Sequence, residues 1–430
     1  MTLTAMLKYD TYKNSGVDWL GEIPFNWNIK PGLVAFSENK RSNKGMKEDV
    51  VLSLSYGKII VKPVEKLVGL VPESFETYQI VEPHDIIVRC TDLQNDQTSL
   101  RIGLAKDHGI ITSAYLNLKV SDAYSARYLY YYLYALDTTK VIYRFGSGLR
   151  QNLSFIDFKR LPVFDIPRDT QTAIADFIDE KTAKIDEAIA IKEQQIARLN
   201  EHKQILIQQA ITQGLDPTVP MKDSGVAWIG KIPAHWVVRR SKFVFCQRKE
   251  RARSDDIQLS ATQAYGVIPQ EQYEEMIGRK VVKITFHLEK RKHVEIDDFV
   301  ISMRSFQGGL ERAWASGCIR SSYVVLRPVN KNEVDAGFFS YMLKLPTYIN
   351  ALQMTASFIR DGQDLNFDNF AQVDLFIPPI EEQKAIFYAI QSKVDEINKS
   401  IALFTDQITK YQEYKTTLIN SAITGKIKVV

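Results

Sequence analysis

Two long stretches of the chain carry apolar residues at alternating steps of three and four positions. Residues 169–213 and 381–424 contain no glycine and no proline. Steps of this kind average about 3.5 residues, the period of a coiled coil, rather than the roughly 3.6 of a lone amphipathic helix. The pattern therefore predicts two long helices, each with a narrow apolar stripe that needs a partner. The stripe residues predicted to form the helix-pair interface are Ile185, Ile189, Ile196, Leu199 and Leu206 in the first stretch, and Ile397, Ile401, Phe404, Ile408, Tyr411 and Leu418 in the second.

The residues that flank both stretches are typical of helix ends. Prolines precede each stretch, at Pro167 and at Pro378-Pro379, and glycines follow at Gly214 and Gly425. Each helix could pack onto its own globular domain, but the shared stripe favours pairing of the two helices with each other. Because a whole module separates them in the chain, we expect an antiparallel pair. At 1.5 Å per residue, a helix of some 40 residues would be about 60 Å long, enough to act as a spacer.

Short β-type runs separated by turn residues fill the segments before each helix. Examples are VVLSLSYGKIIV and DIIVRC in the first segment, and QLSATQAYGVI and SSYVVLRPV in the second. The predicted fold class is α+β, with two pseudo-repeated, globular, β-rich domains separated by two long antiparallel coiled-coil helices. The predicted boundaries are 1–167 for the first domain, 168–213 for the central helix, 214–379 for the second domain and 380–430 for the C-terminal helix.

Several words of the sequence occur twice, about half a chain-length apart. SGVDWLGEIPFNW at 15–27 returns as SGVAWIGKIPAHW at 224–236, and RQNLSFIDF at 150–158 is echoed by GQDLNFDNF at 362–370. A repeat that spans the chain predicts two similar modules with two similar targets. The four tryptophans of the first pair of words could stack on bases, but we interpret them as core packing at the entry to each module.

Composition narrows the class of protein. The 430 residues are 45% hydrophobic and 25% charged, with a formal net charge of +4, as in ordinary globular proteins. No apolar run is long enough for a membrane span, and the N-terminus lacks a signal-peptide pattern. Cys90, Cys246 and Cys318 form no CxxC pair. We therefore expect a cytoplasmic protein with no disulfide framework, no metal site and no membrane partner.

The ordered, duplicated set of words resembles the specificity subunit of type I restriction-modification systems. The matching words are IPPIEEQKAI at 377–386, LPVFDIPRDTQTAI at 161–174, the helix ends AITQGLD and AITGKI, and the WLGEIP and WIGKIP words. The resemblance covers essentially the whole chain. PRDTQ in the first half departs from PPIEEQ in the second, so the two docking surfaces need not match closely.

That resemblance implies partners. Two target recognition domains would each read one half of a bipartite site in double-stranded DNA. The paired helices would fix the spacing and dock modification (DNA methyltransferase) subunits, two by analogy, and restriction (endonuclease and translocase) subunits would join that core. Because the modules differ most in their loops, we expect the two half-sites to differ in sequence.

Proteins that bind duplex DNA use cationic side chains to contact phosphates. They use side chains with paired donors, such as arginine, and amide side chains to contact base edges. A charge run is usually only a solvated surface, and a tyrosine before a turn glycine is as readily explained by packing. The basic loops and the Tyr-Gly turns nevertheless recur at similar places in both modules. The predicted DNA-binding residues are Lys40, Arg41, Lys44, Tyr56, Lys58, Arg89, Arg144, Ser147 and Arg150 in the first module, and Arg248, Arg251, Arg253, Gln263, Tyr265, Lys290, Arg291, Arg304 and Arg360 in the second.

No catalytic or cofactor-binding constellation stands out in the sequence. The chain has no GxxxxGK(S/T) loop, no HExxH and no (N/D)PP(Y/F/W) word, and its six histidines show no ligand spacing. We therefore expect a non-enzymatic chain without a cofactor, whose partners bring S-adenosylmethionine and ATP. The alternative function is a non-DNA adaptor, two binding modules on a helical spacer, which would show no salt-sensitive affinity for duplex DNA.

Overall fold

The structure is a computed structural model that describes residues 6–63, 65, 74–96, 98–148, 151–282, 288–302, 305–355 and 365–429. It divides into two compact units. Unit 1 consists of Met1–Glu193 together with Phe404–Val430, and unit 2 consists of Gln194–Leu403. The four-part division drawn from the sequence remains a prediction. What the two units show is that each combines one β-rich module with half of each long helix.

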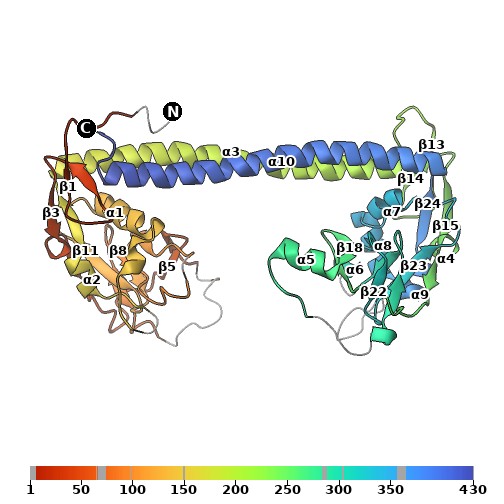
Figure 1. Ribbon diagram of the computed structural model, residues 1–430, viewed down its shortest axis with the longest axis horizontal. Helices are drawn as coiled ribbons and strands as arrows, with labels where there is room; N and C mark the ends of the chain where they lie inside the picture. The colour runs from red at the N-terminus through yellow and green to blue at the C-terminus, as the bar shows by residue number, and fades with distance from the viewer. Residues whose placement is uncertain are drawn as a thin grey trace. The chain divides into compact units, whose positions relative to one another are not determined.

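The two predicted long helices are present, as α3 (Arg168–Gln213) and α10 (Ile380–Ile423), both labelled in Figure 1. In unit 1 they run antiparallel, because Asp186 of α3 pairs with Lys415 of α10 at 2.7 Å while the later Lys192 lies 4.4 Å from the ring centroid of the earlier Phe404. In unit 2 the Nζ of Lys203 donates to Asn398 at 3.1 Å. All eleven predicted stripe residues are buried or half-buried.

Unit 1 is built from short strands and a few helices before α3. Its strands are β1 (Tyr12–Asn14), β2 (Glu22–Pro24), β3 (Asn28–Pro31), β4 (Phe36–Glu38), β5 (Leu52–Ser55), β6 (Lys58–Val61), β7 (Gln79–Val81), β8 (Ile86–Val88), β9 (Ile102–Leu104), β10 (Gly109–Ile111), β11 (Leu116–Val120) and β12 (Pro162–Asp165). Its helices before α3 are η2 (Gly32–Val34), α1 (Ala126–Thr138), η4 (Val141–Arg144) and α2 (Phe155–Arg160).

Unit 2 repeats this plan with some additional helices. Its strands are β13 (Met221–Asp223), β14 (Lys231–Pro233), β15 (Val237–Arg240), β16 (Phe245–Arg248), β17 (Leu259–Thr262), β18 (Gly266–Pro269), β19 (Lys292–Val294), β20 (Phe299–Ile301), β21 (Glu311–Arg312), β22 (Gly317–Ile319), β23 (Val324–Pro328) and β24 (Asp374–Ile377). Its helices before α10 are α4 (Ser241–Val244), α5 (Gln270–Ile277), η5 (Leu288–Lys290), α6 (Ser305–Gly308), α7 (Ala336–Met342), α8 (Pro346–Met354) and α9 (Phe367–Ala371).

Strand topology is the same in both units. Among the described residues, each unit has one four-stranded antiparallel sheet, ordered β4-β11-β8-β9 in unit 1 and β16-β23-β20-β21 in unit 2. Four two-stranded ribbons accompany each sheet: β1-β2, β10-β7, β12-β3 and β5-β6 in unit 1, and β13-β14, β19-β22, β15-β24 and β17-β18 in unit 2. The repeat found in the sequence is thus matched by a repeat of topology.

The repeated tryptophans pack in the cores, as predicted. Trp27 is buried, and its ring centroid lies 5.0 Å from that of Phe164 on β12. Trp236 is fully buried and stacks on Phe376 of β24 at 5.6 Å with an interplanar angle of 14°. These contacts hold the entry of each module against the strand that leads into its long helix. The tryptophans are therefore structural.

The glycine that follows each long helix packs against one copy of the repeated sequence at the start of a module. Gly425 packs against the copy at 15–27 and Gly214 against the copy at 224–236. Gly425 has φ +72°, and a Cβ there would come within 2.5 Å of Pro24. Gly214 has φ +76°, and a Cβ there would lie 3.5 Å from Trp236. Both helix ends thus use the left-handed conformation that glycine adopts readily at a helix C-terminus. The close approach explains why the sequence places glycine there.

Candidate nucleic-acid interface

A repeated acidic turn supports the basic loop in each module. Glu82 and Asp85 stand between β7 and β8, and Glu295 and Asp298 stand at the same place between β19 and β20. In both turns the aspartate accepts a hydrogen bond from the backbone N–H of the glutamate at 2.9 Å. The residue before the aspartate has positive φ in each case, 76° at His84 and 70° at Asp297. The two modules therefore share a turn in which a glutamate and an aspartate have the same arrangement, next to the basic loop of each module.

The first basic loop is anchored to this turn by Arg41. Its guanidinium pairs with Asp85 and with Glu82, the latter at 3.5 Å. Lys40 pairs with Glu38 at 3.1 Å while remaining 76% exposed. Lys44 is exposed as well. Of the three candidates in this loop, the two lysines present their charge to solvent, whereas Arg41 is directed into the protein.

In the second basic loop Arg248 is an internal residue. Its side chain is only 7% exposed, and its guanidinium binds the Asp298 carboxylate at 2.6 and 3.1 Å and Glu250 at 2.7 Å. Breaking such a buried pair is expensive, so the guanidinium is not available to a phosphate. Arg248 is therefore expected to support the loop from inside the protein and not to contact DNA. Arg251 and Arg253 are exposed, although Arg253 also pairs with Glu250 and Glu295 at 3.2 Å.

A groove of about 610 Å³ borders the β5–β6 hairpin in unit 1. Tyr56 at the hairpin tip is 92% exposed with φ 48°, and Lys58 beside it is exposed. The groove is also lined by Lys106 and by the tyrosines of α1, at positions Tyr130, Tyr131 and Tyr134. Both predicted hairpin residues thus lie at the edge of a concave surface with aromatic and basic side chains.

The equivalent hairpin of unit 2, β17–β18, borders a groove of about 750 Å³. Its lining includes the predicted residues Gln263, Tyr265 and Arg291, together with Arg320 and Tyr273, and none of the described residues in this lining is an aspartate or a glutamate. Arg291 is 7% exposed, and its Nε finds no hydrogen-bond partner among the described residues. A guanidinium in the lining of such a groove is suited to an anionic ligand.

Four further candidates do not line either groove. Arg89 is half-buried and pairs with Asp96 at 3.1 Å, whereas Arg144, Ser147 and Lys290 are exposed. Three predicted residues lie outside the described part of the chain: Arg150, Arg304 and Arg360.

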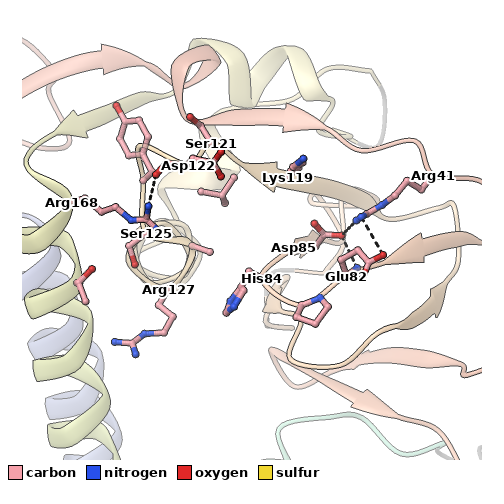
Figure 2. Close-up of a pocket in the computed structure, with 15 residues that line it drawn as sticks. Arg41, Glu82, His84, Asp85, Lys119, Ser121, Asp122, Ser125, Arg127 and Arg168 are labelled. Carbon is pink, nitrogen blue, oxygen red and sulfur yellow. Dashed lines mark hydrogen bonds and ion pairs between the residues drawn. The ribbon is translucent and has the colours of Figure 1, made fainter.

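A third cavity, of about 390 Å³, lies in unit 1 between the Glu82–Asp85 turn and the start of α3. Figure 2 shows Arg41 pointing toward Asp85 and Glu82 on one side and Arg168 on the other, where its guanidinium donates to the Asp122 carbonyl at 2.7 Å. Most cations around this cavity are thus occupied by internal partners. We interpret the cavity as a junction between the sheet and the helices.

Sequence reasoning missed the carboxylates and histidines that organise the loops. His108 lies 2.8 Å from both Glu48 and Glu82, and His293 lies between Asp256 and Glu295. One signal was available, since Val-Glu-x-x-Asp occurs at 81–85 and again at 294–298. The histidines themselves stand at different positions of the two modules and leave no repeated word.

Within the described residues, no group of three or more histidine, cysteine, aspartate or glutamate side chains is arranged to hold a metal ion. Nor does any described helix combine the length and apolarity needed to cross a membrane.

Comparison with known proteins places this geometry in a family context. No family model matches the chain. The type I restriction enzyme MjaX specificity subunit of Methanocaldococcus jannaschii is 24% identical over 309 residues, which cover 70% of this chain and 68% of that protein.

Solved structures agree with the sequence match. A chain from a type I restriction-modification system, studied for its complex assembly and conformational transition, superimposes with a TM-score of 0.67 at 13% identity, covering 93% of this chain and 98% of its own. The HsdS subunit of Thermoanaerobacter tengcongensis gives a TM-score of 0.50 at 14% identity, covering 94% and 98%. The resemblance inferred from the sequence is therefore confirmed: the chain is similar to a curated specificity subunit and has the fold of the specificity subunits of type I restriction-modification systems.

Proposed function

We propose that this chain is the sequence-specific DNA-binding subunit of a type I restriction-modification complex. It reads a bipartite site in double-stranded DNA, one half-site per module, and docks modification and restriction subunits without catalysing a reaction itself. A cytoplasmic location belongs to the same proposal. Its long helices set the separation of the half-sites and carry the docking surfaces.

The observation that carries this proposal is the groove beside the β17–β18 hairpin. Its lining offers Arg291 and Arg320 as cations, Tyr265 and Tyr273 as aromatic surfaces and Gln263 as an amide, and no acidic residue is among the described residues of this lining. Phosphates select such cations, and base edges are read by arginine forks and amides. The β5–β6 hairpin of unit 1 supports the same role with Tyr56 and Lys58.

The two modules are expected to differ in what they read. The unit 1 groove is lined by Asp179 and Asp186 in addition to its lysines, whereas the described lining of the unit 2 groove includes no acidic residue. Equivalent hairpins thus present different chemistry to a DNA edge. This difference supports two half-sites of unlike sequence.

Methylome sequencing of a host that expresses the chain with its neighbouring modification subunit tests the proposal. The expected result is methylated adenine in two short half-sites around an undefined spacer, lost when this chain is deleted. Replacing residues 1–165 by another module should change one half-site only. A stable complex with an active partner that produces no bipartite motif would favour the adaptor instead.

A further inference from the structure

Each module holds its basic loop to the acidic turn through a histidine placed between two carboxylates. In unit 1 the Nε2 of His108 lies 2.8 Å from Glu48, and its Nδ1 lies 2.8 Å from Glu82. Glu48 ends the basic loop that carries Lys40 and Lys44, and Glu82 belongs to the turn between β7 and β8. The imidazole therefore ties the loop to the turn.

Unit 2 makes the same connection with different residues. The Nδ1 of His293 lies 2.9 Å from both oxygens of Asp256, and its Nε2 lies 2.8 Å from Glu295. Asp256 ends the loop that carries Arg251 and Arg253, and Glu295 occupies the place that Glu82 has in unit 1. His293 comes from β19, whereas His108 precedes β10. Two unrelated positions thus converge on one arrangement.

The carboxylate on the loop side also orders the backbone of each loop. Glu48 accepts hydrogen bonds from the N–H groups of Asp49 at 3.0 Å and Val50 at 3.1 Å. Asp256 accepts from the N–H of Arg253 at 2.8 Å. A histidine that fixes either carboxylate therefore fixes the course of the loop backbone and, with it, the origin of the basic side chains.

We propose that His108 and His293 are positioning residues, which hold the two basic loops in the conformation that contacts DNA only while each imidazole carries its second proton. This inference rests on the proposed DNA-binding function. A neutral imidazole can donate from one nitrogen only, so it cannot donate to both carboxylates. Loss of the proton would leave one carboxylate unbound and release that end of the loop.

The charged groups around each imidazole favour its protonated form near neutral pH. For His108, hydrogen bonds to Glu82 and the charges of Glu82 and Glu48 raise the pKa above its ordinary value. For His293, burial alone would lower the pKa, but the hydrogen bonds to Glu295 and Asp256 raise it overall, against an opposing effect of Arg253. The carboxylate of Glu250 also interacts with this imidazole. Each connection is therefore favoured at low pH and is lost as the pH rises through the raised pKa.

The two connections are not equally protected from solvent. The His108 side chain is 46% exposed, whereas the His293 side chain is 1% exposed. Screening by water weakens an exposed ion pair strongly. We therefore expect the loop of unit 2 to depend more on its histidine than the loop of unit 1.

Substitution of the loop-side carboxylates separates this mechanism from simple charge effects. E48Q and D256N each remove one negative charge beside a basic loop, so electrostatics alone predicts tighter binding to DNA. The histidine connection predicts the opposite, because the loop loses its anchor. D107N and D255N are matched controls, because Asp107 precedes His108, Asp255 precedes Asp256, both aspartates are exposed, and each substitution removes the same charge.

The measurement is fluorescence anisotropy of the full chain with a random-sequence 40-base-pair duplex at low salt, at pH 6.0 and pH 8.5. We expect the wild type and the D107N/D255N control to bind about two- to tenfold more weakly at the higher pH. We expect E48Q/D256N to bind weakly at both pH values, with most of the loss due to D256N. Binding by E48Q/D256N as tight as that of the control would overturn the inference.

A second measurement keeps this result distinct from failure of the proposed function. Hydrogen exchange of the Asp49, Val50 and Arg253 amides, corrected for intrinsic pH dependence, should rise in E48Q/D256N but not in the control. If the wild type binds no duplex at either pH, the DNA-binding proposal fails, and the exchange data still decide whether the histidines hold the loops. Unchanged exchange at these amides in E48Q/D256N would refute the connection itself.

Discussion

The side-chain Oε1 of Gln171 accepts a hydrogen bond from the backbone N–H of Ser125 at 2.8 Å, and Ser125 is the N-cap of α1. The Nε2 of the same glutamine donates to the Ile166 carbonyl at 2.8 Å. Gln383 repeats this arrangement in unit 2, where it accepts from Asp335, the N-cap of α7, and donates to the Pro378 carbonyl, both at 2.8 Å. One buried amide therefore fastens the start of each long helix to its module.

Replacing either glutamine by leucine should destabilise its unit. Q171L or Q383L leaves a half-buried N–H and a buried carbonyl without their partner, which lowers the free energy of unfolding by about 1–3 kcal/mol in total. Urea unfolding followed by circular dichroism measures the change. Q209L, on an exposed position of α3, should stay within about 0.5 kcal/mol of the wild type. Equal midpoints for Q171L and Q209L would show that the amide contributes nothing.

Alanine in place of Gly425, which follows α10, should lower the free energy of unfolding by more than the strained backbone conformation alone explains. G425A must adopt positive φ and also place a methyl group against Pro24, so we expect a loss of about 2–4 kcal/mol. G278A, at φ +66° after α5 and with no atom within 4 Å of its Cβ, should lose only about 1 kcal/mol. Thermal unfolding of the two variants makes the comparison. A smaller loss for G425A than for G278A would contradict the docking of the helix end on Pro24.

Glu311 should make the stability of unit 2 depend on pH. Burial raises the pKa of its carboxyl to about 7, although Lys344 pairs with it at 2.7 Å. Because the folded-state pKa exceeds the ordinary 4.5, stability is highest below pH 4.5 and falls as the pH rises through 7. The fall is on the order of 3 kcal/mol at most. E311Q should flatten the unfolding free energy over this window, and an unchanged pH profile would count against a raised pKa.

Arg248 and Arg251 should have separable effects on DNA binding. R251A removes an exposed cation, so the slope of log affinity against log salt should become shallower by about one, with stability unchanged. R248M leaves Asp298 buried without its partner, which lowers the free energy of unfolding by about 3–5 kcal/mol and leaves the salt slope as it was. A shallower slope for stable, folded R248M would place its guanidinium on DNA after all.

The sequence predicted those features that depend on local pattern. The apolar steps and the flanking prolines and glycines predicted α3 and α10 closely. The repeated words at 15–27 and 224–236 predicted tryptophans in the cores, and of these Trp27 and Trp236 are buried. Burial of Arg248 depends on Asp298, fifty positions away, and the role of His108 depends on Glu48 and Glu82. Contacts of this range follow from the pairing of strands, which no local spacing reveals. Basic residues in a loop therefore looked equivalent in the sequence, although the structure separates anchors from exposed cations.

The division of unit 1 between two distant parts of the chain has a consequence for protein synthesis. Its core contains Ile174 and Ile178 of α3 together with Leu418, Ile419 and Ile423 of α10, and the latter are made after all of unit 2. At roughly 5–20 residues per second, the ribosome needs on the order of ten to forty seconds to pass from residue 193 to residue 404. Throughout that interval the nascent first module exposes the apolar side of α3. A nascent chain of this design would need protection from aggregation until its last segment emerges.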